Sequence, residues 1–228
     1  MLYLIIIIFL LVLLFGPQIW VQHVLRKYSQ PQKHIPGNGA ELARHLIEYY
    51  EIKGVEVEQA GNEGDHYDPI DRKVRLSPDN FTQNSLTAVA VAAHEVGHAI
   101  QHHRKEPLLN LRTRLSQWAI NAQKISGGLL IIIPIVTALT RAPSAGLLMF
   151  MVGLGSMFLS TLVQLITLPV EIDASFGKAL PILKQGNYIS AQDEKAVTKI
   201  LKAAAFTYLA GSLSSLLNLW RWLAVLRK

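Results

Sequence analysis

Residues 84–103 read NSLTAVAVAAHEVGHAIQHH. The first half is rich in alanine and valine, which predicts a helix packed closely on its neighbours, and its apolar run is too short to cross a membrane. Residues 94–98 have the pattern H-E-x-x-H. His94 and His98 therefore share one helical face, so both imidazoles can reach one Zn²⁺ ion. Glu95 can reach a water molecule at that ion without being a ligand itself.

A catalytic zinc ion usually has three protein ligands, and Glu171 is our candidate for the third. A metzincin would need a histidine at the position of Arg104. His102 is too distant, because a rise of 1.5 Å per residue puts it about 12 Å from His94 along the helix. Glu171 begins a predicted helix after a long apolar run, and a hairpin formed by that run would return it to the side of the histidines. Asp173 lies on a different face of that helix.

The composition narrows the class of protein. Half of the chain is hydrophobic, only 17% is charged, and the mean hydropathy is +0.27. These values exclude a disordered chain, and the absence of cysteine excludes disulfide frameworks, zinc ribbons and thiol catalysis. The net charge of +6 could indicate nucleic-acid binding. Because many basic residues flank apolar runs, we instead expect them to contact lipid headgroups, with no nucleic-acid partner.

Long uncharged runs predict membrane segments, since about 20 apolar residues can cross a bilayer as a helix. We expect a mainly α membrane protein with about four transmembrane or membrane-embedded helices and a small cytoplasmic α+β zincin-like module. The candidate runs are Leu2–Val21, Gly128–Leu139, Gly146–Val170 and Ala203–Leu219. Whether the second and the fourth cross the bilayer completely stays open.

The basic residues after the first run predict the orientation, with the polar module in the cytoplasm. A fourth span would put Arg227 and Lys228 on the wrong side, and an interfacial last helix would remove this conflict. The predicted organisation is an N-terminal membrane anchor (1–21), a cytoplasmic metalloprotease module (22–126), a transmembrane helical hairpin (127–170), a cytoplasmic helix with the third ligand (171–202) and a C-terminal membrane or interfacial helix (203–228).

Local signals predict the elements of the polar module. Asn38 and Glu41 form a capping-box pattern at the start of a helix. Alternating side chains predict a sheet of two or three strands between residues 55 and 77. Pro78 has the position of a first helical residue, and an amphipathic helix is expected after Pro107.

Three segments carry a resemblance to a known family. They are His66-Tyr67-Asp68-Pro69, residues 94–101 (HEVGHAIQ) and Glu171-Ile172-Asp173-Ala174-Ser175. Together they resemble the YugP-like bacterial membrane zinc metallopeptidases over nearly the whole chain, and more distantly the HtpX-like and CAAX prenyl proteases. The resemblance implies a gluzincin whose third ligand lies in a Glu-x-x-x-Asp motif. Ser175 stands where this motif has its aspartate, so Ser175 or Asp173 would take over the role beside the ligands.

In such proteases an edge strand pairs with the extended substrate, and we expect Val74-Arg75-Leu76 to be that strand. Tyr67 and His66 are candidates for stabilising the oxyanion. The alternatives are an ordinary sheet strand and residues that only stabilise a turn, and both stay open.

The leading hypothesis is a multi-pass membrane endopeptidase, with its active site on the cytoplasmic side, that cleaves membrane-associated or unfolded polypeptides. His94, His98 and Glu171 would hold Zn²⁺, and Glu95 would be the general base. Expected partners are the polypeptide substrate and the lipid bilayer. A membrane-protein partner or a second copy stays open. The alternatives are a non-catalytic scaffold with structural zinc, completed by His102 or Asp173, and, less favoured, a protease with its metal at bilayer depth.

Overall fold

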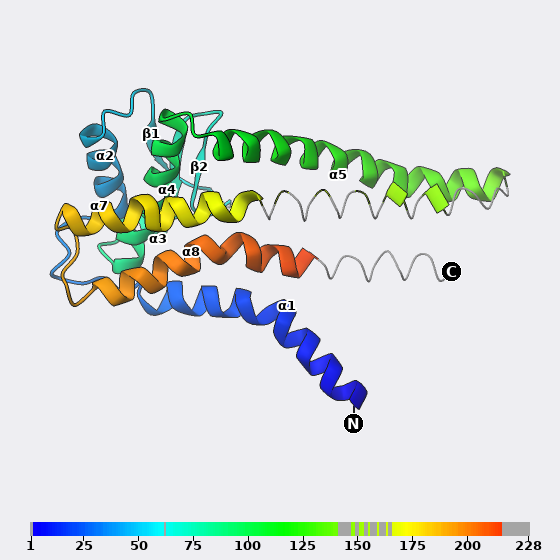
Figure 1. The fold of residues 1–228 in the computed structure, drawn as a ribbon, viewed down its shortest axis with the longest axis horizontal. Helices are drawn as coiled ribbons and strands as arrows, with labels where there is room; N and C mark the ends of the chain where they lie inside the picture. Colours follow the sequence, from blue (N-terminus) through cyan, green and yellow to red (C-terminus); the bar gives the residue numbers. More distant parts are fainter. Residues whose placement is uncertain are drawn as a thin grey trace.

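The computed structural model describes residues 2–61, 63–140 and 166–215, with isolated positions between 147 and 163. A head of short helices and a small sheet lies at one end, and long helices extend from it toward the other end (Figure 1). These long helices are α1 (Leu2–Lys27), α5 (Pro107–Thr140) and α8 (Glu194–Ser215). In Figure 1, α1 bends midway, and this helix contains Pro17, which removes a backbone donor and disfavours a straight helix.

Helix α4 (Leu86–His103) is the centre of the head. Every residue from Leu86 to Gln101 is buried, which explains its alanine-rich sequence: small side chains let neighbours approach on all sides. Ser85 caps the helix, with its Oγ accepting a hydrogen bond from the Ala88 amide at 3.1 Å. The helices α2 (Gly39–Tyr49) and α8 and the π-helical segment η1 (Asp173–Ala179) pack on α4.

The predicted helix starts of the module are confirmed. Asn38 and Glu41 form both hydrogen bonds of a capping box at the start of α2. Pro78 is the first residue of α3 (Pro78–Thr82), and Pro107 is the first residue of α5. The short helix α7 (Leu180–Gln185) follows η1 directly.

The predicted sheet is also confirmed, but its strand order corrects one expectation. The strands β1 (Glu56–Gln59), β2 (His66–Asp68) and β3 (Lys73–Leu76) are arranged in the order β1-β3-β2. β3 is parallel to β1 and antiparallel to β2, so both of its edges are already paired. The expectation that Val74-Arg75-Leu76 is an edge strand is therefore wrong, and the outer edges of this sheet belong to β1 and β2.

The expectation of about four transmembrane or membrane-embedded helices is corrected as well. Among the residues that the structure describes, no helix combines the length and the apolar character that crossing a bilayer requires. Part of the apolar content of the runs lies in the core: Val21 of α1, Val170, and Ala203 and Ala205 of α8 are buried.

The elements also differ from the predicted division of the chain. The boundaries after residues 21, 126 and 202 fall inside the continuous helices α1, α5 and α8. Glu171 does not begin a helix, because residues 166–172 are already helical and continue into η1. Residues 141–146, within the hairpin predicted for 127–170, lie outside the described residues.

Candidate metal centre

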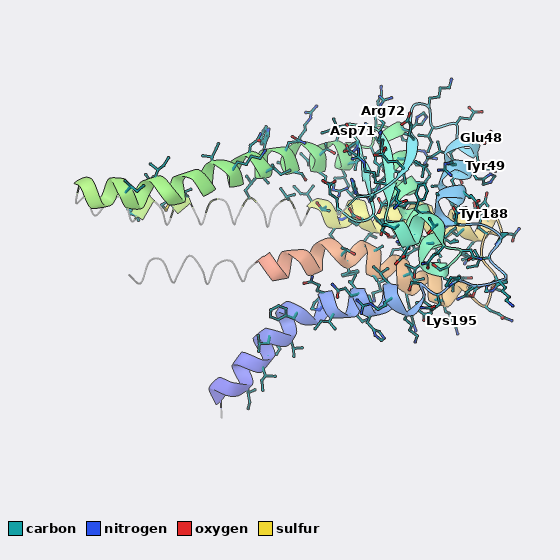
Figure 2. All side chains as sticks on the ribbon, turned by 180° about the vertical axis from the view of Figure 1, so that it is seen from behind. Glu48, Tyr49, Asp71, Arg72, Tyr188 and Lys195 are labelled. Atoms are coloured by element: carbon teal, nitrogen blue, oxygen red, sulfur yellow. The ribbon has the colours of Figure 1, made fainter. Side chains whose placement is uncertain are left out.

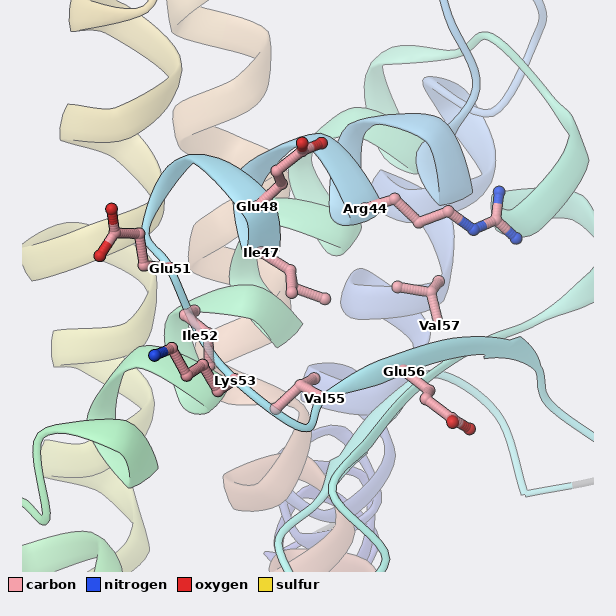
Figure 3. Close-up of a pocket in the computed structure, with 9 residues that line it drawn as sticks. All are labelled: Arg44, Ile47, Glu48, Glu51, Ile52, Lys53, Val55, Glu56 and Val57. Atoms are coloured by element: carbon pink, nitrogen blue, oxygen red, sulfur yellow. The ribbon is translucent and has the colours of Figure 1, made fainter.

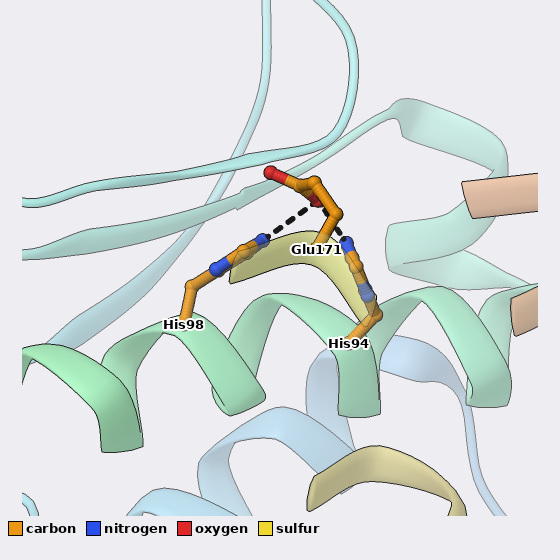
Figure 4. A group of neighbouring side chains, drawn as sticks. All are labelled: His94, His98 and Glu171. Carbon is orange, nitrogen blue, oxygen red and sulfur yellow. Dashed lines mark hydrogen bonds and ion pairs between the residues drawn. The ribbon is translucent and has the colours of Figure 1, made fainter. Parts of the chain in front are cut away.

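Three buried side chains from two helices meet beside α4. His94 and His98 lie one turn apart on α4, and Glu171 comes from the helical segment before η1 (Figure 4). The Nε2 atoms of both histidines lie 3.1 Å from the same carboxylate oxygen, Oε2 of Glu171. One candidate ligand atom from each residue lies within 4.8 Å of the others, which is close enough to surround one metal ion.

The tautomer of His94 follows from the hydrogen bonds of Ser175. The Ser175 hydroxyl donates its single hydrogen to the carbonyl of Leu201 at 3.0 Å. Its oxygen also lies 2.9 Å from His94 Nδ1 and must therefore accept a hydrogen bond from that nitrogen. The proton of the neutral imidazole is thus on Nδ1, and the lone pair of Nε2 points toward Glu171.

Gln101 fixes His98 in the same way. Its Nε2 donates to the carbonyl of Val170 at 2.9 Å and to Asp173 Oδ2 at 2.8 Å, which sets the orientation of the side-chain amide. The amide oxygen therefore faces His98 Nδ1, at 2.8 Å, and accepts its proton. Lys178 forms an ion pair with Asp173 and so supports this contact from the other side.

These assignments make the centre a site for a cation. Two imidazole lone pairs and one carboxylate oxygen converge, and none of these three atoms carries a hydrogen to share with the others. Without a cation the atoms would repel one another in a buried environment, which is costly. Two imidazole nitrogens and one carboxylate oxygen are a zinc-type donor set, with Nδ1 of each histidine held by a second group, as metal-binding histidines usually are.

The second oxygen of Glu171 faces Arg112 of α5. Oε1 lies 3.2 Å from Arg112 Nη2, and this buried oxygen accepts no hydrogen bond from the described part of the chain. Burial alone would raise the pKa of Glu171. Positive charge beside the carboxylate holds the pKa below its ordinary value: the Arg112 guanidinium faces Oε1, and a cation bound between the imidazoles would act in the same direction. Glu171 is therefore a buried carboxylate that stays ionised.

Glu95 is buried beside the three ligand candidates without belonging to them. Burial raises the pKa of its carboxyl to about 7, and the negative charge of Glu171 acts in the same direction. Glu95 directly follows His94 on α4.

Tyr67 and His66 of β2 make their polar contacts elsewhere in the described structure. The Tyr67 hydroxyl lies 2.7 Å from His102 Nδ1, and burial raises the pKa of Tyr67 to about 12. Nδ1 of His66 lies 3.0 Å from the carbonyl of Gly64. The structure therefore joins neither residue directly to the ligand group, and it places His102 in a contact with the sheet.

Two side chains of the centre were missed in the sequence. Gln101 has a local signal, because it follows His98 by three residues and so lies on the same side of α4. Arg112 has none: it lies on another helix, and only the packing of α5 brings it to Glu171. Ser175 contacts the ligand candidate His94 directly, and Asp173 contacts Gln101, which in turn contacts His98.

One cavity lies beside the metal centre, and a larger groove lies away from it. A cavity of about 250 Å³ lies between β2 and α5, and its lining includes Tyr67 and Arg112. A larger groove of about 830 Å³ lies between α2 and β1, with Ile47, Val55 and Val57 among its lining side chains (Figure 3). None of the metal-centre residues lines this larger groove, so size alone does not identify the active site.

Comparisons with known proteins agree with this reading of the centre. Residues 3–227 match a protein family described as "Putative neutral zinc metallopeptidase". The chain is also 36% identical over 225 residues to a Bacillus subtilis (strain 168) protein named "Putative membrane protease YugP", and the match covers 96% of this chain and 95% of the relative. No solved structure matches the chain.

Proposed function

Because this chain belongs to that family of zinc metallopeptidases, we propose that it is an endopeptidase of the gluzincin type that hydrolyses polypeptides. The convergence of His94, His98 and Glu171 on one point carries the proposal. The hydrogen bonds from His94 Nδ1 to Ser175 and from His98 Nδ1 to Gln101 support the proposal, because they leave the lone pairs of both Nε2 atoms available to a metal.

Three side chains would bind the metal, and a fourth would orient one of them. Nε2 of each histidine and Oε2 of Glu171 would be the protein ligands, which leaves a fourth position for the reaction. Arg112 holds the other oxygen of Glu171, so that the carboxylate offers the metal a single oxygen. Zinc in such a site polarises the scissile carbonyl and makes a water molecule acidic enough to lose its proton near neutral pH.

Glu95 would be the general base. It receives the proton of the attacking water and then passes it to the leaving amine, as the peptide bond breaks. The burial of Glu95 supports this role, because a carboxylate with few water molecules around it binds a proton more readily. Tyr67 and His66 remain candidates for stabilising the oxyanion, and this role would require Tyr67 to leave its contact with His102.

The substrate would lie in the groove between β2 and α5. With β3 in the middle of the sheet, β2 is the strand near Arg112 whose outer edge is available to pair with an extended chain. The Bacillus subtilis relative is named as a membrane protease, which supports action at a membrane. The proposed substrates are membrane-associated or unfolded polypeptides.

The test is to compare Glu95→Gln with the unchanged protein on an unfolded substrate such as casein, with zinc content measured on the same samples. We expect bound zinc to be retained and kcat/KM to fall by about 100-fold or more, because the amide cannot accept the proton. Glu48→Gln, an exposed glutamate on α2, is the matched control and should change neither quantity.

Two outcomes would count against the proposal. A zinc-loaded Glu95→Gln variant with full activity would remove Glu95 from the mechanism. A folded, zinc-loaded unchanged protein that cleaves no polypeptide would favour the alternative of a non-catalytic scaffold with structural zinc.

A further inference from the structure

A second cavity, of about 510 Å³, lies on the other side of Tyr67 from the groove beside Arg112. It is open to solvent and is bordered by the loop before β1, the turn between β2 and β3, the segment at the C-terminal end of α4 and the start of α5. Four cationic side chains line it, one from each of these parts of the chain: Lys53, Arg72, Lys105 and Arg114. The imidazoles of His102 and His103 line it as well, and no acidic residue does.

The four cations have no ion-pair partner among the described residues. On the neighbouring sheet surface, by contrast, the cations are paired: Lys73 and Arg75 form ion pairs with Glu58, and Arg75 also forms one with Asp68. Burial lowers the pKa of His102, and the nearby Arg72 and His103 lower it further. A cavity that gathers unpaired cations is suited to an anionic ligand.

The backbone supports the same conclusion. Arg72 has φ of 55° and Lys105 has φ of 54°, which is the left-handed region that glycine adopts most easily. Lys105 follows the end of α4, at the position where helices most often have glycine. Two positions at which glycine would be less strained thus both present a cation to one cavity, and such strain is commonly kept at functional sites.

The cavity continues the proposed substrate path. Tyr67 forms a wall of both cavities, and Arg112 in the first of them contacts the ligand candidate Glu171. His102 of the second cavity lies four residues after His98 and eight after His94, which is about 6 and 12 Å along the axis of α4. The point between the two histidines is thus about 9 Å from His102, and an extended peptide covers that distance in about three residues, at 3.3 Å each.

We propose that this cationic cavity binds an acidic segment of the polypeptide substrate, two or three residues from the cleaved bond. The substrates would then be polypeptides with neighbouring aspartate or glutamate residues at that place. Four unpaired cations favour several carboxylates over one, and each arginine can bind a carboxylate through two parallel hydrogen bonds. The inference rests on the proposed peptidase function, because only a peptidase would make the bound polypeptide a substrate. The predicted binding itself does not need catalysis.

The test uses peptides of equal length that differ only in having Glu-Glu or Gln-Gln at the second and third residues from the scissile bond. One such peptide pair has the two residues before the bond, and a second pair has them after it. We expect the acidic peptide to have a kcat/KM at least about 10-fold higher, mainly through a lower KM, and we expect added salt to reduce the difference. Equal kcat/KM values for all peptides would overturn the proposal.

The double variant Arg72→Gly/Lys105→Gly removes two charges where glycine suits the backbone, so it should fold with an unchanged or higher Tm. We expect it to lose most of the preference for the acidic peptide. Asn187→Gly is the matched control, because Asn187 also has a positive φ, of 54°, and lies outside the cavity. Lys195→Ala controls for charge, since exposed Lys195 lies far from Arg72 (Figure 2). A folded double variant that keeps the preference would refute the inference.

A binding measurement separates this inference from the proposed function. Labelled acidic and Gln-Gln peptides are titrated into the zinc-loaded Glu95→Gln variant, and anisotropy is recorded. One outcome is that the unchanged protein cleaves none of the peptides, while the Glu95→Gln variant binds the acidic peptide at least about 10-fold tighter than the Gln-Gln peptide. If adding Arg72→Gly and Lys105→Gly then abolishes this difference in affinity, the peptidase proposal fails and the anion site stands. Equal binding of both peptides would remove the anion site, whatever the protein cleaves.

Discussion

Gly97 of α4 lies directly against the main chain of Ala174 in η1. A Cβ atom on Gly97 would come within 2.8 Å of the Ala174 carbonyl oxygen and within 3.4 Å of its carbonyl carbon. Gly97 is one of the two unspecified positions of the H-E-x-x-H pattern, and Ala174 lies between Asp173 and Ser175. The missing side chain lets the helix with Glu171 approach the helix with the histidines closely enough to complete one centre.

Gly97→Ala should therefore weaken both the fold and the metal site. The added methyl group meets main-chain atoms, which cannot rotate away, so α4 and η1 must separate by some tenths of an ångström. We expect a loss of about 1 to 3 kcal/mol in the free energy of unfolding, as for other overpacked sites, and weaker zinc binding in a competition titration. Gly128→Ala is the control, because nothing lies within 4 Å of its Cβ position and alanine favours a helix.

Ser175→Ala should lower zinc affinity with little effect on the fold. The change removes the acceptor that holds the proton of His94 on Nδ1, so Nε2 is no longer fixed as the metal-binding atom. We expect a loss of about 10- to 100-fold in zinc affinity, the usual effect of removing a group that orients a ligand. Thr198→Ala also removes a hydroxyl that bonds to a helix carbonyl, but away from the centre, and should leave the affinity unchanged. Equal affinities of the Ser175→Ala variant and the unchanged protein would show that Ser175 does not set the tautomer.

Metal removal should destabilise the protein, because three lone pairs would then face one another without a cation. At a free zinc concentration of 100 times Kd, binding adds about 2.7 kcal/mol to the free energy of unfolding, so a chelator should lower Tm by several degrees. Glu171→Gln should abolish most of this zinc-dependent shift, since a ligand charge is lost. Glu95→Gln should keep it, because Glu95 is not one of the ligands. A full zinc-dependent shift in Glu171→Gln would refute the assignment of Glu171.

Asp68 should contribute to the acid sensitivity of the fold. Burial raises its pKa, but hydrogen bonds from the Asp71 and Ile70 amides and from Arg75 outweigh this and hold the pKa below the ordinary 3.8. A lowered carboxyl pKa stabilises the folded state above pH 3.8, and this stabilisation disappears as the pH falls through the lower folded value. Asp68→Asn should cost about 1 kcal/mol at pH 7. It should also flatten the decline of unfolding free energy between pH 5 and pH 2, measured by urea titration.

Glu48→Gln controls for the removal of one acidic side chain from an exposed position. If Asp68→Asn and Glu48→Gln gave the same pH dependence, the network around Arg75 would not be the source of the effect.

Local patterns predicted the parts of the head correctly. The capping box at Asn38, the helix start at Pro78 and the sheet between residues 55 and 77 depend on contacts between residues close in sequence, and all three were confirmed. Strand order was not predictable in the same way. A parallel partner on one side and an antiparallel one on the other make β3 central, and alternation of side chains does not specify which strands pair.

The apolar runs were the least reliable guide. They were interpreted by length and hydropathy alone, which do not distinguish a residue that faces lipid from one that fills a core. Val21, Val170 and Ala203 lie in such runs and are buried in the described structure. Hydropathy measures the preference of a side chain for an apolar environment, and packing decides which environment it receives.

The sequence by itself determined that two imidazoles share a helical face with a glutamate beside them, because helix geometry repeats every few residues whatever surrounds it. Its lack of cysteine also limited the ligands to histidine and carboxylate. Only the tertiary structure decided that Glu171, 73 positions after His98, faces both imidazoles, and that Arg112 and Gln101 hold the groups around it. Contacts over such separations depend on how closely whole helices pack, and here that closeness depends on a missing side chain at Gly97.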